Sequence, residues 1–186
     1  MRDLRYRAVV EQSDWFTCGP AAAATLLSRY FGLNVSEARV VELAVAFMNL
    51  DPGRAGPPSG ITLKALSQAM EVLGVPSSGY RVSLEALAGY FRRGGLPVIL
   101  HVSRPRPHFV VGVGYVAGQM VADDPWWGRE VVPLAEWAQA RGYEGITLVP
   151  RAPADLARLA SRRQLQELNE VVGRRRRLRA LGAAGP

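Results

Sequence analysis

Hydrophobic residues in the first half of the chain recur every three or four positions, the spacing of amphipathic helices. Residues 17–33 open with the triplet CGP at Cys18, continue through four alanines and end at Gly32, so we expect a helix that starts near Cys18. Three more segments share this spacing and are predicted as helices: residues 36–48, 61–75 and 83–95. Ser36 and Ser83 stand where N-cap residues belong.

From residue 96 the hydrophobic period shortens to two, which is typical of strands. Short β-branched runs predict strands at residues 79–82, 96–103, 108–116, 119–124 and 145–150, and a hairpin turn at 117–118. Helices followed by hairpin-linked strands predict an α+β fold, in which an N-terminal helical half packs on an antiparallel β-sheet half. The turn-rich segment 51–60 is a candidate rim for a cleft.

The length of 186 residues suits one globular core of roughly 150 residues plus an extension. We therefore expect one domain over residues 1–150 and, over residues 151–186, an amphipathic C-terminal helix with an Arg-rich end. No apolar run is long enough to span a membrane, so no membrane insertion is expected. The N-terminus shows no secretory h-region, which favours the cytoplasm, or export if the N-terminus was trimmed.

The net charge of +7 is concentrated at the end of the chain. Residues 1–150 hold 14 basic and 13 acidic residues, whereas residues 151–186 hold 9 basic and 3 acidic ones. The body is nearly neutral, so nucleic acid is not an expected partner, and only the run Arg174–Arg177 could attract phosphate or an acidic membrane surface.

Cys18 is the only cysteine, which rules out an internal disulfide and any multi-cysteine metal site. A thiol at a helix N-terminus has a lowered pKa, because the unpaired backbone N–H groups there favour the thiolate. The same N–H groups could bind an oxyanion, Gly19 would let a substrate backbone approach, and Gln12 could add a side-chain N–H. The structural alternative is a buried cysteine at a helix start.

The chain offers two histidines as a general base, and His108 is the better placed. Folding the hairpin over residues 108–124 brings His108 and Asp124 to the end away from the turn, where the carboxylate can fix the imidazole tautomer. His101 lies within a predicted strand and can equally be a structural residue. Of the pair Asp123 and Asp124, we choose Asp124 because it directly precedes Pro125, which ends the strand.

These residues, in this order, resemble the double-glycine (bacteriocin-processing) cysteine peptidases, a family with a papain-like fold. The resemblance covers about residues 5–150 and rests on the segments YRAVVEQSDWFTCGPAAAATLL, GITLKALSQAMEVLG, RVSLEAL, LPVILHV, HFVVGVGY, ADDPWWG and VVPLAEW. By this resemblance Cys18 is the nucleophile and His108 the general base. Asp124 is then the orienting acid and Gln12 the oxyanion glutamine.

The resemblance implies cleavage after a Gly-Gly or Gly-Ala pair at the end of a helical leader peptide, without a metal or organic cofactor. It implies a peptide or protein substrate, and it implies nothing about the oligomeric state. The sequence departs from the best-known members, which are fused to a peptide exporter, because it contains no membrane segment and no P-loop. A glycine-selective cleft needs bulky walls, and these candidates flank the catalytic segments: Trp15, Phe16, Trp126 and Trp127. They can equally belong to the core.

Three alternatives stay open from the sequence. A transferase or deamidase would use the same Cys-His-Asp set, because each begins with an acyl-thioester. A non-catalytic peptide-binding module would keep its activity after Cys18→Ala. Finally, Glu167, Leu168, Val171 and Gly173 follow the pattern of a double-glycine leader, which raises the hypothesis that the C-terminal helix occupies the substrate groove.

Overall fold

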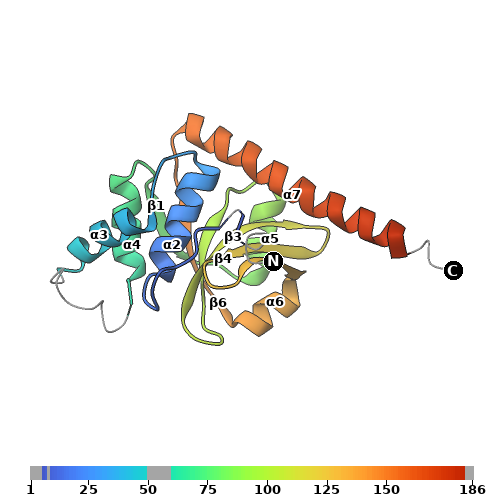
Figure 1. Ribbon diagram of the computed structural model, residues 1–186, viewed down its shortest axis with the longest axis horizontal. Coiled ribbons are helices and arrows are strands. Elements are labelled where there is room, and N and C mark those ends of the chain that lie inside the picture. The colour runs from blue at the N-terminus through green and yellow to red at the C-terminus, as the bar shows by residue number, and fades with distance from the viewer. Residues whose placement is uncertain (1–5, 8, 50–59, 183–186) are drawn as a thin grey trace.

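The protein is built around one six-stranded antiparallel sheet, seen in the computed structural model of Figure 1. The structure describes residues 6–7, 9–49 and 60–182. The strands are β1 (Ser77–Arg81), β2 (Val98–Val102), β3 (His108–Val116), β4 (Gln119–Asp124), β5 (Gly128–Pro133) and β6 (Tyr143–Pro150). They lie side by side in the order β1-β6-β2-β3-β4-β5. Residues 51–59, most of the predicted cleft rim, lie outside the described residues.

Seven helical segments surround this sheet in the described part of the chain. They are α2 (Cys18–Thr25), the π-helix η1 (Leu26–Tyr30), α3 (Glu37–Phe47), α4 (Leu63–Val72), α5 (Leu84–Arg92), α6 (Leu134–Arg141) and α7 (Ala154–Gly182). The predicted N-caps are confirmed, because the hydroxyls of Ser36 and Ser83 accept hydrogen bonds from the backbone N–H groups three residues on. None of these helices is long and apolar enough to cross a membrane.

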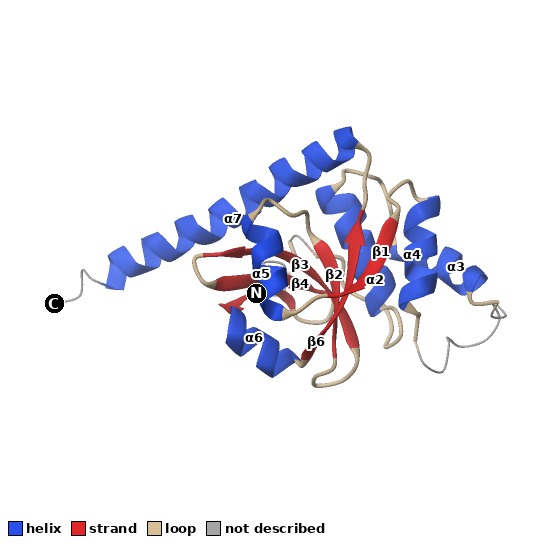
Figure 2. Cartoon of the chain, turned by 180° about the vertical axis from the view of Figure 1, so that it is seen from behind, coloured by secondary structure: helices blue, strands red, loops and turns tan. Residues whose placement is uncertain are grey.

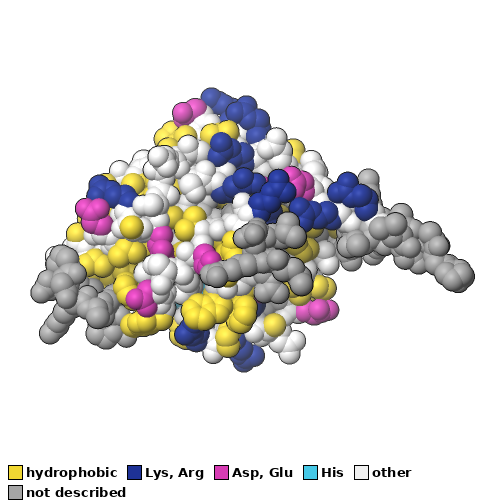
Figure 3. Space-filling view, viewed as in Figure 1, with side chains coloured by type: hydrophobic (Ala, Val, Ile, Leu, Met, Phe, Trp, Pro, Cys, Tyr) yellow, Lys and Arg dark blue, Asp and Glu magenta, His cyan; other side chains and the backbone are white. Residues whose placement is uncertain are grey.

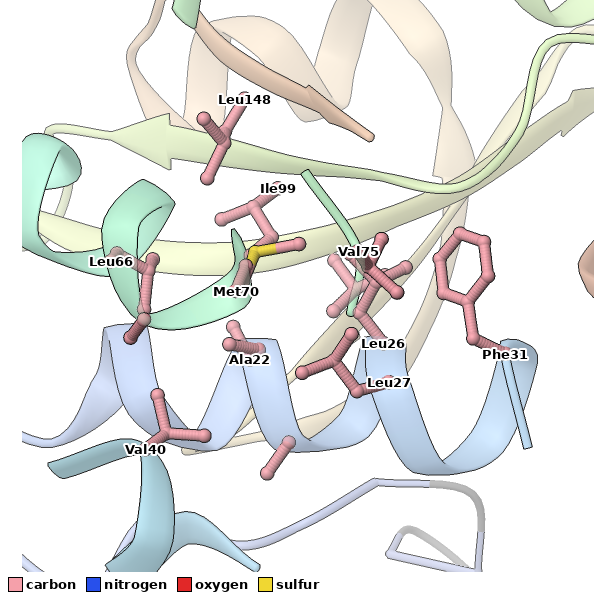
Figure 4. Close-up of a cluster of buried hydrophobic side chains, with 14 of the residues drawn as sticks. Ala22, Leu26, Leu27, Phe31, Val40, Leu66, Met70, Val75, Ile99 and Leu148 are labelled. Atoms are coloured by element: carbon pink, nitrogen blue, oxygen red, sulfur yellow. The ribbon is translucent and has the colours of Figure 1, made fainter. Parts of the chain in front are cut away.

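The first face of the sheet packs on α2, which is the central helix of the molecule. Gly19 to Thr25 are all buried, because small alanine side chains let α2 approach β3 closely. Figure 4 shows the resulting core, to which α2, η1, α3, α4, β2 and β6 all contribute. Its labelled residues are Ala22, Leu26, Leu27, Phe31, Val40, Leu66, Met70, Val75, Ile99 and Leu148. This packing fixes the start of α2 relative to β3.

The opposite face of the sheet is covered by α5 and α6, as the view from behind shows (Figure 2). Alternation along the strands explains the two cores: Leu100 and Val110 face α5 and α6, whereas Ile99 and Val111 face α2. The side chain of Trp137 on α6 is fully buried in this second cluster. Residues at one end of β3 and β4 can therefore reach α6 on one face and α2 on the other.

The predicted α+β fold is confirmed, and two elements were missed, β5 and α6. The segment of β5 is short and half-exposed at the sheet edge, so its hydrophobic alternation is weak. The helix α6 has almost no apolar stripe, although Gly142, in the left-handed conformation with φ 63°, marks its end. The predicted hairpin turn is confirmed at Ala117 and Gly118, both with positive φ.

The C-terminal helix α7 crosses the molecule on the α2 side of the sheet, and its end projects past the body (Figure 1). Gln164 donates from Nε2 to the carbonyl oxygens of Gly95, at 2.9 Å, and Val113, at 2.7 Å. Ala160 is fully buried in the first core, and Leu168 lies on Gly114, where a side chain would collide with it. Basic side chains gather over this helix in the space-filling view (Figure 3).

Candidate active site

Cys18 is the first residue of α2, and the N-cap residue of this helix makes no side-chain capping hydrogen bond in the described part of the chain. This N-cap residue is Thr17, and the first turn carries no acidic side chain. Pro20 has no N–H, and the N–H of Ala21 donates to the carbonyl oxygen of Thr17 at 2.9 Å. The N–H groups of Cys18 and Gly19 are thus the donors that this positive helix end offers to an anion.

His108 and Asp124 meet at the end of the β3–β4 hairpin, opposite the turn. The Nε2 of His108 donates to Oδ1 of Asp124 across 2.8 Å, and both side chains are buried. Because this bond occupies Nε2, the Nδ1 of the neutral ring keeps the lone pair that can accept a proton. The side chain of His108 also lies close enough to Cys18 to lower the pKa of its thiol. The structure therefore brings Cys18, His108 and Asp124 into one chain of contacts.

The pKa of Cys18 is lowered, although burial by itself raises it. The hydrogen bond and the charge of His108 lower the pKa, and the backbone N–H groups of Phe109 and Gly19 lower it further. These lowering effects outweigh the burial. The site therefore favours the thiolate form of Cys18, which is the reactive form of a cysteine nucleophile.

Gln12 lies next to the strand end that carries Asp124, because its N–H donates to the carbonyl oxygen of Pro125 at 3.1 Å. Its side-chain Nε2 donates to the carbonyl oxygen of Asp14 at 2.7 Å, which fixes the orientation of the amide. An amide nitrogen carries two N–H bonds, so one donor stays available for an oxyanion. Its Oε1 is buried without a hydrogen-bond partner in the described residues.

Sequence reasoning missed Arg141, which lies on α6 behind the catalytic centre. Its guanidinium donates to Oδ2 of Asp124, while Oδ1 accepts the N–H groups of Trp126, at 2.7 Å, and Trp127, at 3.1 Å. The Nε of Arg141 lies 3.6 Å from the carboxylate of Glu130. Asp124 is thereby held on both oxygens and cannot turn away from His108. The signal that could have revealed Arg141 was the helix end at Gly142, where a basic residue in the last turn is common.

His101 lies on β2 beside the hairpin but outside the chain of contacts. Its ring packs edge-on against Phe109, with 5.1 Å between the ring centroids. The pKa of His101 is lowered from its ordinary value, because burial and the neighbouring His108 outweigh the opposite effect of Glu144. His101 therefore has the features of a structural residue.

Four of the residues predicted to line the substrate site differ in their surroundings. Trp15 and Trp126 are half-exposed and line a cavity of about 400 Å³ together with Gln12. Phe16 is half-buried and packs against the first core. Gly19 is buried, and a side chain there would point at Phe109 and Leu66, so its small size serves the close packing of α2. Among the described residues, no group of three or more His, Cys, Asp or Glu side chains is arranged so that it could hold a metal ion.

The residues of α7 that follow the leader-like pattern lie on the rest of the protein at a distance from Cys18. Leu168 contacts Gly114, six residues along β3 from His108. Glu167 accepts hydrogen bonds from Arg29 on η1 and from Arg129 on β5. Gly173 lies within the helix, with no atom within 4 Å of where its side chain would begin. Within one chain, therefore, Gly173 does not occupy the catalytic centre.

Comparisons with known proteins agree with this site. A family model described as the Peptidase C39 family matches residues 7–154. Among curated relatives is "Probable functional amyloid protease FapD" of Pseudomonas aeruginosa, 28% identical over 147 residues, which are 78% of this chain and 61% of the relative. The chain thus spans about three fifths of the length of that relative.

Two solved structures show the same fold. The peptidase domain of Streptococcus ComA, a bifunctional ABC transporter, has a TM-score of 0.63 and 21% identity over 78% of this chain and 98% of that one. A double glycine motif protease from an AMS/PCAT transporter, in complex with its leader peptide, has a TM-score of 0.62 and 23% identity, over 78% and 91%. The fold is that of papain-like cysteine peptidase domains. The chain belongs to the Peptidase C39 family, as the sequence resemblance predicted.

Proposed function

We propose that this protein cleaves a peptide bond with Cys18 as nucleophile, His108 as general base and acid, and Asp124 as the group that orients His108. The observation that carries the proposal is the chain of contacts from the Cys18 thiol at an uncapped helix N-terminus, through His108, to the doubly held carboxylate of Asp124. Each group has the partner that its chemical role requires.

The reaction follows from this geometry. Nδ1 of His108 takes the thiol proton, and the Cys18 thiolate attacks the substrate carbonyl carbon to form a tetrahedral oxyanion. The N–H of Cys18 and the remaining N–H of the Gln12 amide stabilise that oxyanion. His108 then returns its proton to the leaving amine as the C–N bond breaks. A water molecule, deprotonated by His108, hydrolyses the thioester and restores the thiol.

We further propose that the substrate is cut after a Gly-Gly-type pair at the end of a leader peptide. The family match supports this, and so does the related fold of a double glycine motif protease solved with its leader peptide. The half-exposed Trp15 and Trp126 beside Gln12 offer bulky walls that would exclude larger side chains next to the cleaved bond.

The test is to offer a library of helical leaders ending in Gly-Gly to the wild type and to Cys18→Ala, and to identify new termini by mass spectrometry. We expect cleavage after the second glycine by the wild type alone. Cleavage that survives Cys18→Ala would refute the nucleophile. Cleavage of Leu-Leu controls at the same rate would refute the glycine selectivity. Transfer of the acyl group to a peptide amine in preference to water would indicate an acyl transferase instead.

A further inference from the structure

A second cavity, of about 240 Å³, adjoins His108 and includes two arginines in its lining. Its lining residues are Pro105, Arg106, His108, Trp126, Trp127 and Arg141. In the proposed reaction His108 delivers its proton to the leaving amine, so a cavity that includes the His108 ring lies where the departing part of the peptide begins. One or two extended residues, at about 3.3 Å each, reach across such a cavity.

Arg106 is the unpaired charge in this cavity. Arg141 is already paired with Asp124, whereas the guanidinium of Arg106 lies over the indole ring of Trp126, 4.2 Å from its centroid. In the described part of the chain Arg106 has no carboxylate or other hydrogen-bond acceptor. Its donors are therefore free, and the stacking holds the planar group at the cavity.

The backbone around Arg106 restricts where that guanidinium can go. Pro105 and Pro107 flank it, and proline fixes its own φ and limits the conformations of the preceding residue. A guanidinium on a restricted loop, stacked on an aromatic ring, loses little entropy when a carboxylate binds to two of its N–H groups. Arg106 is exposed, but these features restrain its guanidinium more than that of an unstacked surface arginine.

We propose that Arg106, supported by Trp126, binds a carboxylate on the first or second residue after the cleaved bond, and that the enzyme therefore prefers substrates whose released segment begins with an acidic residue. This inference rests on the proposed peptidase function. The carboxylate can come from an Asp or Glu side chain or from a free C-terminus two residues after the cut, and the experiment separates the two.

The experiment compares kcat/KM for leader peptides that differ only after the Gly-Gly pair: Asp against Asn, Glu against Gln, and a free against an amidated C-terminus. We expect the wild type to prefer the acid roughly three- to tenfold, with the preference shrinking in about 1 M salt. Arg106→Gln should bring the ratio to one. Arg104→Gln, on the same loop and outside the cavity, is the matched control and should keep the preference.

Preference in the free-terminus arm alone would assign the site to an α-carboxylate, and preference in the side-chain arms alone to Asp or Glu. Equal cleavage of acid and amide peptides would overturn the Arg106 proposal while leaving the peptidase intact. If no peptide is cleaved, the proposed function fails. Binding of the same peptides to Cys18→Ala, followed by tryptophan fluorescence, then still tests Arg106, and equal affinities would overturn it.

Discussion

Two neighbouring residues of β4, Asp123 and Asp124, have the same side chain, the same complete burial and an arginine partner each, yet they face opposite sides of the sheet. Asp124 faces α6, where it binds Arg141 and the titratable His108. Asp123 faces α2 and α7, where the hydroxyl of Tyr30 donates to it at 2.7 Å and Arg129 donates through two nitrogens at 2.7 and 2.9 Å.

The network around Asp123 joins the helical half, the sheet half and the C-terminal helix. Arg129 bridges Asp123 and Glu167, and Glu167 also pairs with Arg29, one residue before Tyr30. Every charge here has an opposite charge beside it, so no group is left to react. The site of Asp124 differs because His108 also lowers the pKa of the Cys18 thiol. We infer that Asp123 serves stability and Asp124 serves catalysis.

Asp124→Ala should give the largest effect on activity. Without the carboxylate, His108 loses the hydrogen bond that fixes its tautomer, and we expect kcat/KM to fall by about 10²–10⁴. Steady-state kinetics on protein shown by circular dichroism to be folded measures the loss. A decrease of less than threefold would show that Asp124 does not orient the base.

Asp123→Asn should produce the opposite result. It leaves Arg129 with a neutral partner inside a buried network, and we expect the free energy of unfolding to fall by about 3 kcal/mol. Urea unfolding followed by fluorescence measures this change. Per folded molecule, kcat/KM should stay within about threefold of the wild type. A catalytic loss as large as that of Asp124→Ala would end the distinction between the two aspartates.

The reactivity of Cys18 sharpens the catalytic side of the comparison. Because the pKa of Cys18 is lowered, its thiolate forms at a lower pH than that of a free cysteine. The rate of alkylation by iodoacetamide should therefore rise with pH through a midpoint below that of a free cysteine. In His108→Ala only burial and the backbone donors remain, so the midpoint should rise and the rate at pH 6 should fall roughly tenfold. His101→Ala, the control, should leave the midpoint in place, and an equal shift in both variants would refute the role of His108.

Much of this arrangement follows from local sequence. Several features depend only on residues within a few positions of each other. They are the helix start at Cys18, the caps at Ser36 and Ser83, and the hairpin turn at Ala117 and Gly118. The hairpin alone brings His108 to Asp124, so this contact was predictable from strand pairing.

What the sequence did not reveal depends on contacts between distant segments. Arg141 reaches Asp124 from a helix without an apolar stripe, and Arg129 and Glu167 meet across 38 positions. Nothing in the local pattern around Asp123 or Asp124 shows which face of the sheet each one meets. Gly19 is a similar case, because its close neighbour Phe109 lies ninety positions away.

Glu167→Gln should give the smallest effect, and this effect should be on the free energy of unfolding and not on kcat/KM. Burial raises the pKa of Glu167, but Arg129 and Arg29 lower it more, so the folded-state pKa lies below the unfolded value of about 4.3. The ion pairs therefore stabilise the fold fully above about pH 4.3, and this contribution is lost as the pH falls through the folded-state pKa.

At pH 7 we expect Glu167→Gln to lower the free energy of unfolding by about 1 kcal/mol, a discounted figure because Arg29 is partly exposed. The difference from the wild type should vanish as the pH is lowered towards 3, with kcat/KM unchanged at pH 7. Urea unfolding at several pH values measures it, and Glu170→Gln, whose partner Arg174 lies exposed on the same helix, is the control. If both variants lose the same stability at every pH, Glu167 does not fasten α7 to the network of Asp123, and the two aspartates differ only in their distance from Cys18.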